Sequence, residues 1–581
     1  MRQLIAALIL VWWMFQIGAR VGFCPMDEGL VLAQAHRLLL GQTPHIDFIT
    51  PRPALSAVLH LGDLALPLPT FLASRLVALL QITTYSTVLA SLVFRRNPRQ
   101  WTLVQFCAWG CALLLNVHGF PLMAWYTIDG ILLVAAGFAL VDRDATDDRL
   151  TLAMGSGLVL LGAAPLTKQS FFAAPLVGAL MLWTRAHGRP LGERVRSVAR
   201  GVSITAIPGL LYAGIVAARG GSAAMVQQLL GAQATWGAVL LGPFLAPGGR
   251  QRLLALVAML AVTSACDAQV RRGVRGAQAA ILAALALRLA LSVMIVAPAI
   301  EASLTWQLSG WGVQIWCVVL VVCAWRMILE RALDRVALLL LLLGWMTSLS
   351  WGYANPNLVI GSIALAGVWS LWRAVPAPPV AYTRAVGVAA AGLSLLALVV
   401  TARSFAVARS LPYFDRPAAE AVVDLGRVSP ALAGIRGNPT TAAFLEDITT
   451  CIARHPARRV AVVPDNAWVY PALGLDDPLP LDWLYPPEYR SDSKAILRRT
   501  RTLAREGDYL VLFQPLPAHL VCRYDGPLPP AGVPFVPGGY GDGLPLSILT
   551  KLAGRNVRCG SVWGVWKPAV AAGLPDVGRR R

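Results

Sequence analysis

The chain has 581 residues, of which 56% are hydrophobic and only 14% are charged, and its mean hydropathy is +0.61. These values exclude an ordinary soluble globular protein and predict a polytopic membrane protein. The formal net charge is +20, but the basic residues are spread over short loops between apolar segments. The charge therefore does not indicate a nucleic-acid-binding surface.

Apolar segments long enough to cross about 30 Å of hydrocarbon recur from residue 3 to residue 405. With a cytoplasmic N-terminus, every arginine cluster between them falls on the cytoplasmic side. The first segment could pass for a signal peptide, but Cys24-Pro25 is a poor cleavage context, so we interpret it as an uncleaved helix. We predict about thirteen transmembrane helices, at residues 3–21, 70–94, 101–117, 127–141, 150–166, 169–184, 201–218, 251–268, 277–298, 311–326, 336–350, 357–373 and 385–404.

A long outer segment, residues 24–69, follows the first helix and begins with the acidic pair Asp27-Glu28. Adjacent carboxylates just outside a bilayer can bind a divalent cation or take a proton from a nucleophile. The alternative is that they only cap the next helix, because acids favour a helix N-terminus. The apolar spacing from residue 30 to residue 40 predicts an interfacial amphipathic helix, and residues 54–66 predict a second one.

The turn between these two helices brings Asp47 and Arg52 back toward the acidic pair. Lys168-Gln169 lies between two apolar segments that are joined on the outer side, and an ammonium group there pairs well with a phosphate. The alternative for Lys168 is that it snorkels to the interface. Arg52 is the second candidate for binding a phosphate.

Three further polar positions fall in or beside the predicted spans. Asp129 lies at the outer end of the fourth span, where a carboxylate is costly without a partner, and it has either an active-site or a capping role. Arg288 is the only basic residue deep inside a predicted span, and we predict a structural ion pair for it. Tyr353 and Asn355, in an outer turn, either line a sugar or lipid site or belong to an aromatic belt.

Near residue 406 the apolar segments shorten and Pro, Asp and Arg become frequent, which predicts a water-soluble outer domain over residues 406–581. Strands at 459–464 and 508–513, with a helix at 492–506, predict a small α/β domain. An oxidising compartment would allow one disulfide among Cys451, Cys522 and Cys559, and the sequence does not select the pair. Residues 485–490 and 537–543 are predicted to be loops that either contact the acceptor or are ordinary surface turns, and neither is assigned a catalytic residue.

The first outer segment resembles that of a known family. Asp27-Glu28-Gly29, residues 35–41, Pro44, Asp47-Phe48 and Pro51 resemble the first outer loop of GT-C glycosyltransferases, in particular the branch of the lipid-A aminoarabinose transferases and protein O-mannosyltransferases. The resemblance implies about thirteen spans in a catalytic domain over residues 1–405, two juxtamembrane helices in its outer loop, and a soluble outer domain. The residues that carry it lie mainly between 24 and 53.

Members of this family transfer a sugar from a polyprenyl-phosphate carrier. The resemblance implies that Asp27 is the catalytic carboxylate, either as general base on the acceptor hydroxyl or as a metal ligand, with Glu28 in support and Asp129 nearby. The family is mixed in its metal use, so Mg²⁺ or Mn²⁺ at Asp27 and Asp129 is an option. The expected substrate-binding residues are Arg52, Lys168, Gln169, Asp47, Tyr353 and Asn355.

We therefore expect a glycosyltransferase that acts with inversion on a lipid, glycan or protein acceptor, in a bacterial plasma (inner) membrane, with its active site on the periplasmic or extracellular side. Two alternatives stay open: a transporter or flippase of lipid-linked glycans, and a transferase of the O-antigen ligase or polymerase type. The sequence has no P-loop, no GxGxxG after a strand and no GxSxG, so nucleotide-driven transport and serine hydrolase chemistry lack support.

Overall fold

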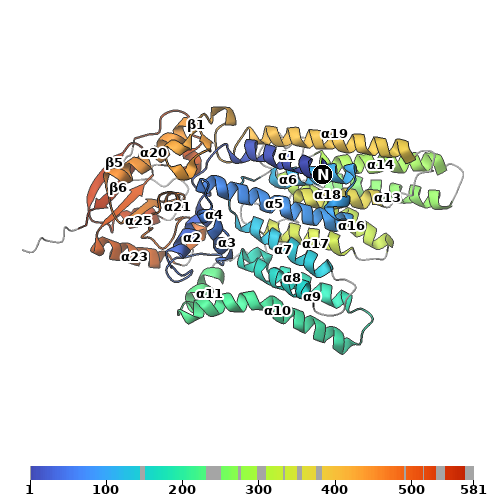
Figure 1. Cartoon of the computed structure of the whole chain (residues 1–581), viewed down its shortest axis with the longest axis horizontal. Helices are drawn as coiled ribbons and strands as arrows, with labels where there is room; N and C mark the ends of the chain where they lie inside the picture. The colour runs from blue at the N-terminus through green and yellow to red at the C-terminus, as the bar shows by residue number, and fades with distance from the viewer. Residues whose placement is uncertain are drawn as a thin grey trace, which may run out of the picture. The chain divides into compact units, whose positions relative to one another are not determined.

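The structure is a computed structural model of the whole chain (Figure 1). It describes residues 2–118, 120–143, 151–230, 250–272, 277–297, 309–330, 334–349, 356–373, 383–489, 492–514, 516–530 and 543–569. The chain divides into two compact units, each built from three separate segments. We call them the helical unit (Met1–Ala19, Leu76–Leu211 and Ala234–Leu411) and the sheet unit (Arg20–Arg75, Tyr212–Gln233 and Pro412–Arg581).

Helices occupy each of the thirteen ranges that the apolar segments predict, and within the helical unit Figure 1 shows many of them running alongside one another. The two predicted boundaries of the second helix match those of α5. The others differ by a few residues, except that α10 begins ten residues earlier than expected. The helices are α1 (Arg2–Met14), α5 (Thr70–Phe94), α6 (Leu103–His118), α7 (Tyr126–Arg143), α8 (Leu152–Ala163), α9 (Ala174–Arg185), α10 (Leu191–Ala218), α13 (Arg250–Arg272), α14 (Ala277–Val296), α16 (Ser309–Glu330), α17 (Arg335–Ser348), α18 (Ile360–Arg373) and α19 (Thr383–Arg409).

Among the described residues, three helices have both the length and the apolar composition to cross a membrane: Thr70–Phe94, Leu191–Ala218 and Arg384–Arg409. Many of the other apolar helices of the helical unit are shorter, between 10 and 17 residues. The number of membrane crossings therefore stays a prediction.

Small residues allow the helices of this unit to approach closely. A methyl group on Gly157 of α8 would lie 2.6 Å from the carbonyl oxygen of Gly137 on α7, and one on Gly361 of α18 would lie 2.0 Å from the carbonyl oxygen of Ala112 on α6. Backbone contact of this kind is typical of helices packed in a membrane, where small residues give the van der Waals contact that lipid cannot replace.

The sheet unit contains a four-stranded mixed sheet in the order β3-β4-β6-β5. β3 (Arg459–Val463) and β4 (Tyr509–Phe513) are parallel and are joined through α23 (Ser493–Glu506), so both predicted strands and the predicted helix are confirmed. β6 (Val562–Lys567) and β5 (Arg555–Cys559) add antiparallel pairs. A small sheet domain is present, as expected.

The first outer segment belongs to this sheet unit. Ile49 is part of the same buried cluster as Val463 and Val511 of the sheet, and its N–H donates to the carbonyl of Pro480 over 2.6 Å. This grouping differs from the expected division, in which residues 24–69 form part of the membrane domain. The physical reason is that this segment buries apolar side chains and backbone hydrogen bonds against residues 412–581.

Three helical segments of the sheet unit bear on the expected juxtamembrane helices. α2 (Leu30–Leu39) confirms the first as a helix, but most of its side chains are buried, so it is not simply laid on a lipid surface. The prediction of one continuous second helix over residues 54–66 is wrong, because α3 (Leu55–Leu59) and α4 (Leu61–Ala65) are separated at His60. The ring of His60 forms a hydrogen bond with Asp63 over 2.7 Å. α11 (Ser222–Leu230) is unpredicted.

The structure contains a disulfide between Cys451 and Cys559, with a Cα–Cα separation of 5.5 Å, and this is the pair that the sequence could not select. It links α20 (Pro439–Arg454) to β5. Cys522, the remaining cysteine of the C-terminal segment, is a buried free thiol.

Candidate active site around Asp27

Asp27 and Glu28 lie in the turn that leads from the first helix into α2. Both side chains are buried, with 6% of their surface exposed. Gly29, which follows them, has φ of +106°, and a methyl group there would lie 2.6 Å from the Cα atom of Trp468. Only glycine fits this conformation and this approach, so the turn is fixed against the C-terminal segment. Gly29 is also the N-cap of α2, and no side chain bonds that end of the helix, so neither acidic residue is its N-cap. A favourable effect of their charges on the helix N-terminus stays a prediction.

Asp27 is bound by a residue far along the chain. The hydroxyl of Tyr413 donates to Oδ2 of Asp27 over 2.8 Å. Burial raises the pKa of Asp27 to about 6; the hydrogen bond from Tyr413 opposes this shift, as does the charge of Arg52, while the charge of Glu488 adds to it. A carboxylate with a pKa near 6 is mostly ionised at neutral pH and is well matched to act as a general base.

Glu28 has a different environment, because it is paired with Arg75. Nε and Nη2 of Arg75 donate to the two oxygens of Glu28 over 2.6 Å each, and Nη2 also donates to the carbonyl of Gly22 over 2.7 Å. Burial raises the pKa of Glu28 and Arg75 opposes the rise. This pair holds the turn in place, which is a supporting role for Glu28 beside Asp27.

Arg52 makes a two-pronged pair with Glu488: Nη1 and Nη2 each donate to one carboxylate oxygen over 2.7 Å. Glu488 has only 2% of its surface exposed, so the prediction of a surface turn at residues 485–490 is wrong at this position. The carboxylate binds the Nη1–Nη2 edge of the guanidinium, which a phosphate can bind in the same two-pronged way. Phosphate binding by Arg52 stays a prediction.

Asp47 has a local partner. Its Oδ2 accepts from the N–H of Thr43 over 2.6 Å, which closes the turn between α2 and α3, and its side chain is exposed. The neighbouring His45 is buried and bonds Gln228 over 2.9 Å and Tyr212 over 2.7 Å. The described contact of Asp47 is therefore structural, and a substrate contact stays a prediction.

Arg37 anchors α2 within the sheet unit. Its Nη2 and Nε donate to Asp477 and Asp482 over 2.8 Å each, and all three side chains are buried. Nη2 also donates to the carbonyl of Leu479 over 2.7 Å. This buried network positions the helix that follows the Asp27 turn.

In the helical unit, two of the predicted residues lie near the first turn of α7. Asp129 is fully buried, and its Oδ1 accepts from the side chain of Gln81 over 2.8 Å. Lys168 is buried and donates to the hydroxyl of Thr127 over 3.3 Å, two residues before Asp129. Gln169 begins the short 3₁₀ helix Gln169–Phe171 directly after Lys168. The structure thus brings Asp129 and Lys168 to the same end of α7.

Arg288 confirms the predicted ion pair. Its Nη2 donates to Oδ2 of Asp267 over 2.5 Å, and its Nε donates to the carbonyl of Leu371 over 2.9 Å. Both side chains are largely buried. Tyr353 and Asn355 lie outside the described residues, as do residues 537–542.

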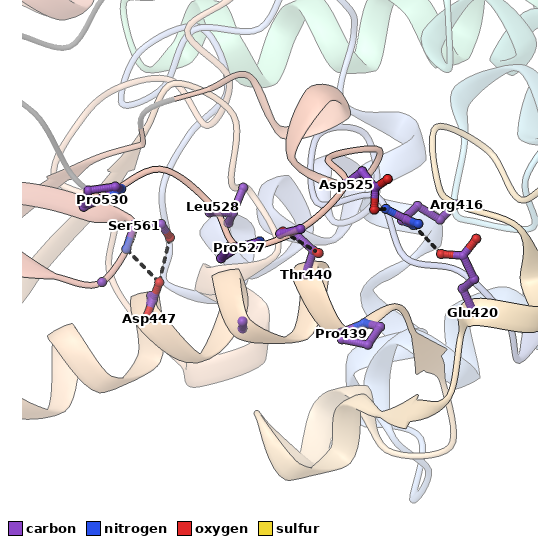
Figure 2. A pocket seen from close by; sticks show the side chains of 13 residues that line it. Arg416, Glu420, Pro439, Thr440, Asp447, Asp525, Pro527, Leu528, Pro530 and Ser561 are labelled. Carbon is purple, nitrogen blue, oxygen red and sulfur yellow. Dashed lines mark hydrogen bonds and ion pairs between the residues drawn. The ribbon is translucent and has the colours of Figure 1, made fainter.

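The sheet unit also contains an open pocket with a volume of about 580 Å³ (Figure 2). Arg416 bonds both Glu420 and Asp525, and Asp447 accepts from the N–H and the hydroxyl of Ser561 over 2.8 and 2.7 Å. Each charged group that lines this pocket thus has a partner within the lining, and the lining contains none of the predicted site residues.

Tyr413 and Glu488 are the residues around Asp27 that sequence reasoning missed. Both come from the C-terminal segment, and neither belongs to a motif with a characteristic spacing. The only sequence signal for either residue is the pair of prolines before Glu488, and such a pair is equally typical of an ordinary surface turn.

Comparison with protein-family models and with curated protein sequences finds no match. Among solved structures, the chain is similar to the crystal structure of ArnT from Cupriavidus metallidurans in the apo state, with a TM-score of 0.39 and 12% sequence identity. The similarity covers 88% of this chain and 92% of that chain. A likeness of this level does not identify the function.

Proposed function

We propose that the chain is a membrane glycosyltransferase of the GT-C type, which moves a sugar from a polyprenyl-phosphate carrier to a lipid, glycan or protein acceptor on the outer face of the membrane. The observation that carries the proposal is the buried Asp27 carboxylate, with a pKa of about 6 and a hydrogen bond from Tyr413. The likeness of residues 24–53 to the first outer loop of that family supports it. The transferred sugar is a hexose or a pentose.

The chemistry needs a base and a counter-charge. A sugar on a lipid phosphate is already activated, because the phosphate departs from the anomeric carbon. Asp27 takes the proton of the acceptor hydroxyl as that oxygen attacks, which gives inversion in one displacement. Positive charge on the departing phosphate stabilises the transition state, and Arg52, in the same unit as Asp27, is the proposed source. Lys168 belongs to the helical unit, and its contact with the phosphate stays a prediction. For Arg52 this requires the phosphate to replace Glu488 on the guanidinium.

Mg²⁺ or Mn²⁺ at Asp27 and Asp129 stays a prediction. Among the described residues, the group of three His, Cys, Asp or Glu ligand atoms within 4.8 Å of one another is Cys451, His455 and Cys559, which does not include Asp27. Asp27 and Asp129 also belong to different units. The effect of a chelator on sugar transfer is the measurement that tests for the cation.

The test is Asp27→Asn, assayed in detergent with a panel of polyprenyl-phosphate-linked hexoses and pentoses. The amide keeps the shape of the side chain but cannot accept the proton, so transfer should fall by about 10²- to 10⁴-fold. Asp476→Asn, at an exposed carboxylate of the same unit, is the matched control. Wild-type rates from folded Asp27→Asn protein would refute the assignment. Movement of the lipid-linked substrate across vesicles without transfer would favour the flippase alternative.

A further inference from the structure

Two free thiols of the sheet unit lie together beside the Asp27 turn. Cys24 and Cys522 are both buried, with 5% and 0% of their surface exposed. The Sγ atom of Cys522 is 3.5 Å from the carbonyl oxygen of Phe23, the residue directly before Cys24. The two thiols are also within hydrogen-bonding reach of each other, and this contact, together with burial, raises the pKa of Cys24.

The backbone on both sides of the thiol pair is already held by hydrogen bonds. The N–H of Phe23 donates to Oδ2 of Asp415 over 3.1 Å. Asn438 bonds the other oxygen of Asp415 and donates to the carbonyl of Cys522 over 2.9 Å. Asp415 and Asn438 therefore connect the backbone beside Cys24 to the backbone of Cys522, and hold the two cysteines next to each other in the folded chain.

We propose that Cys24 and Cys522 form a second disulfide in the mature protein, joining the Asp27 turn covalently to the C-terminal segment. The proposal rests on the outer, oxidising location of the sheet unit in the proposed function. Each thiol loses one proton and the pair loses two electrons. The disulfide of a thiol oxidoreductase accepts the two electrons and two protons, and is reduced to a dithiol. Because both thiols are buried in the folded chain, the bond forms while the C-terminal segment is still folding.

The consequence for the site is positional. Asp27 lies three residues after Cys24, so a bond at Cys24 holds the start of the turn that carries the carboxylate. Tyr413, which bonds Asp27, and Cys522 lie in the same C-terminal segment. The disulfide thus restrains the distance between Asp27 and the segment that supplies its hydrogen-bond donor.

The experiment is mass spectrometry of the full-length protein, purified from membranes without reductant. Free thiols are blocked with N-ethylmaleimide under denaturing conditions before digestion with trypsin. Cleavage after arginine places Cys24 in the peptide 21–37 and Cys522 in the peptide 506–523. We expect these two peptides to be joined in most molecules and to separate on reduction. In a Cys522→Ser variant, Cys24 should instead carry the maleimide.

Cys451–Cys559 is the internal control for the compartment. If that pair is joined while Cys24 and Cys522 both carry maleimide, the proposed disulfide is wrong and the proposed function is untouched. If all four cysteines carry maleimide, the proposal is wrong together with the outer location of the sheet unit. Transfer activity of the wild type is measured on the same preparation, so failure of the function is scored separately.

Discussion

Replacing Tyr413 with Phe removes one hydrogen bond from the Asp27 carboxylate and keeps the aromatic ring. A hydrogen bond to a charged group contributes about 1.5 to 3 kcal/mol, and 1.36 kcal/mol corresponds to one pKa unit, so the pKa should rise by about 1 to 2 units. Since this bond opposes the rise caused by burial, its loss moves the pKa of Asp27 from about 6 to roughly 7 to 8.

The sign of the effect on catalysis follows from the role of Asp27 as a base. Activity needs the ionised carboxylate, so it falls as the pH falls through the pKa. At pH 7 the ionised fraction should drop from about 90% to between about 10% and 50%, a loss of about 2- to 10-fold, and it should recover by about pH 9.

The assay is the pH dependence of kcat/KM for sugar transfer, which reports the pKa of the free enzyme. Tyr524→Phe, at a partly exposed tyrosine of the same unit, is the control and should leave the profile unchanged. A Tyr413→Phe profile that coincides with that of the wild type would refute the role of this hydrogen bond. An equal loss at every pH would show that Tyr413 acts other than through the ionisation of Asp27.

Two further predictions concern buried ion pairs. Arg37→Ala leaves the carboxylates of Asp477 and Asp482 without their counter-charge, and should lower the free energy of unfolding by about 3 to 5 kcal/mol, read as a lower melting midpoint in detergent. Arg288→Met should destabilise the helical unit by a similar amount, roughly 3 to 5 kcal/mol, and adding Asp267→Leu should restore most of the loss, because the uncompensated buried charge is removed.

Arg427→Ala is the control for both ion-pair predictions. Arg427 pairs with Glu446 at the surface, with 54% and 40% of the two side chains exposed, so its loss should change stability by less than about 1 kcal/mol. Equal shifts of the melting midpoint in Arg37→Ala and Arg427→Ala would contradict the importance of burial. A double variant of Arg288 and Asp267 that is no more stable than the single one would contradict the second prediction.

The helices were predictable from the sequence because their signal is local. An apolar segment reports its own length and ends, as at 70–94, where the predicted helix and α5 have the same boundaries. α11 carried no such signal, since its nine residues are too short to span a membrane. The division at His60 was also hidden, because apolar residues continue on both sides of it in the sequence.

The candidate site was predictable only in part, for the opposite reason. Asp27 could be named because it lies beside a membrane helix within a recognisable loop. Its partners could not, because Tyr413 is 386 residues away, and Glu488 is 436 residues from Arg52. Arg52 was expected to bind a phosphate. In the structure it pairs with the buried carboxylate of Glu488, and no local sequence pattern near either residue predicts this pair.

The three-segment construction of the sheet unit sets the order in which the site comes into existence during synthesis. Asp27 leaves the ribosome early, but the 386 residues that separate it from Tyr413 take about 20 to 80 s to add at about 5 to 20 residues per second. Throughout that time the turn lacks its hydrogen-bond donor, the sheet and the partners of Arg37. A nascent chain that stalls before residue 412 carries every predicted membrane helix and an unfinished active site.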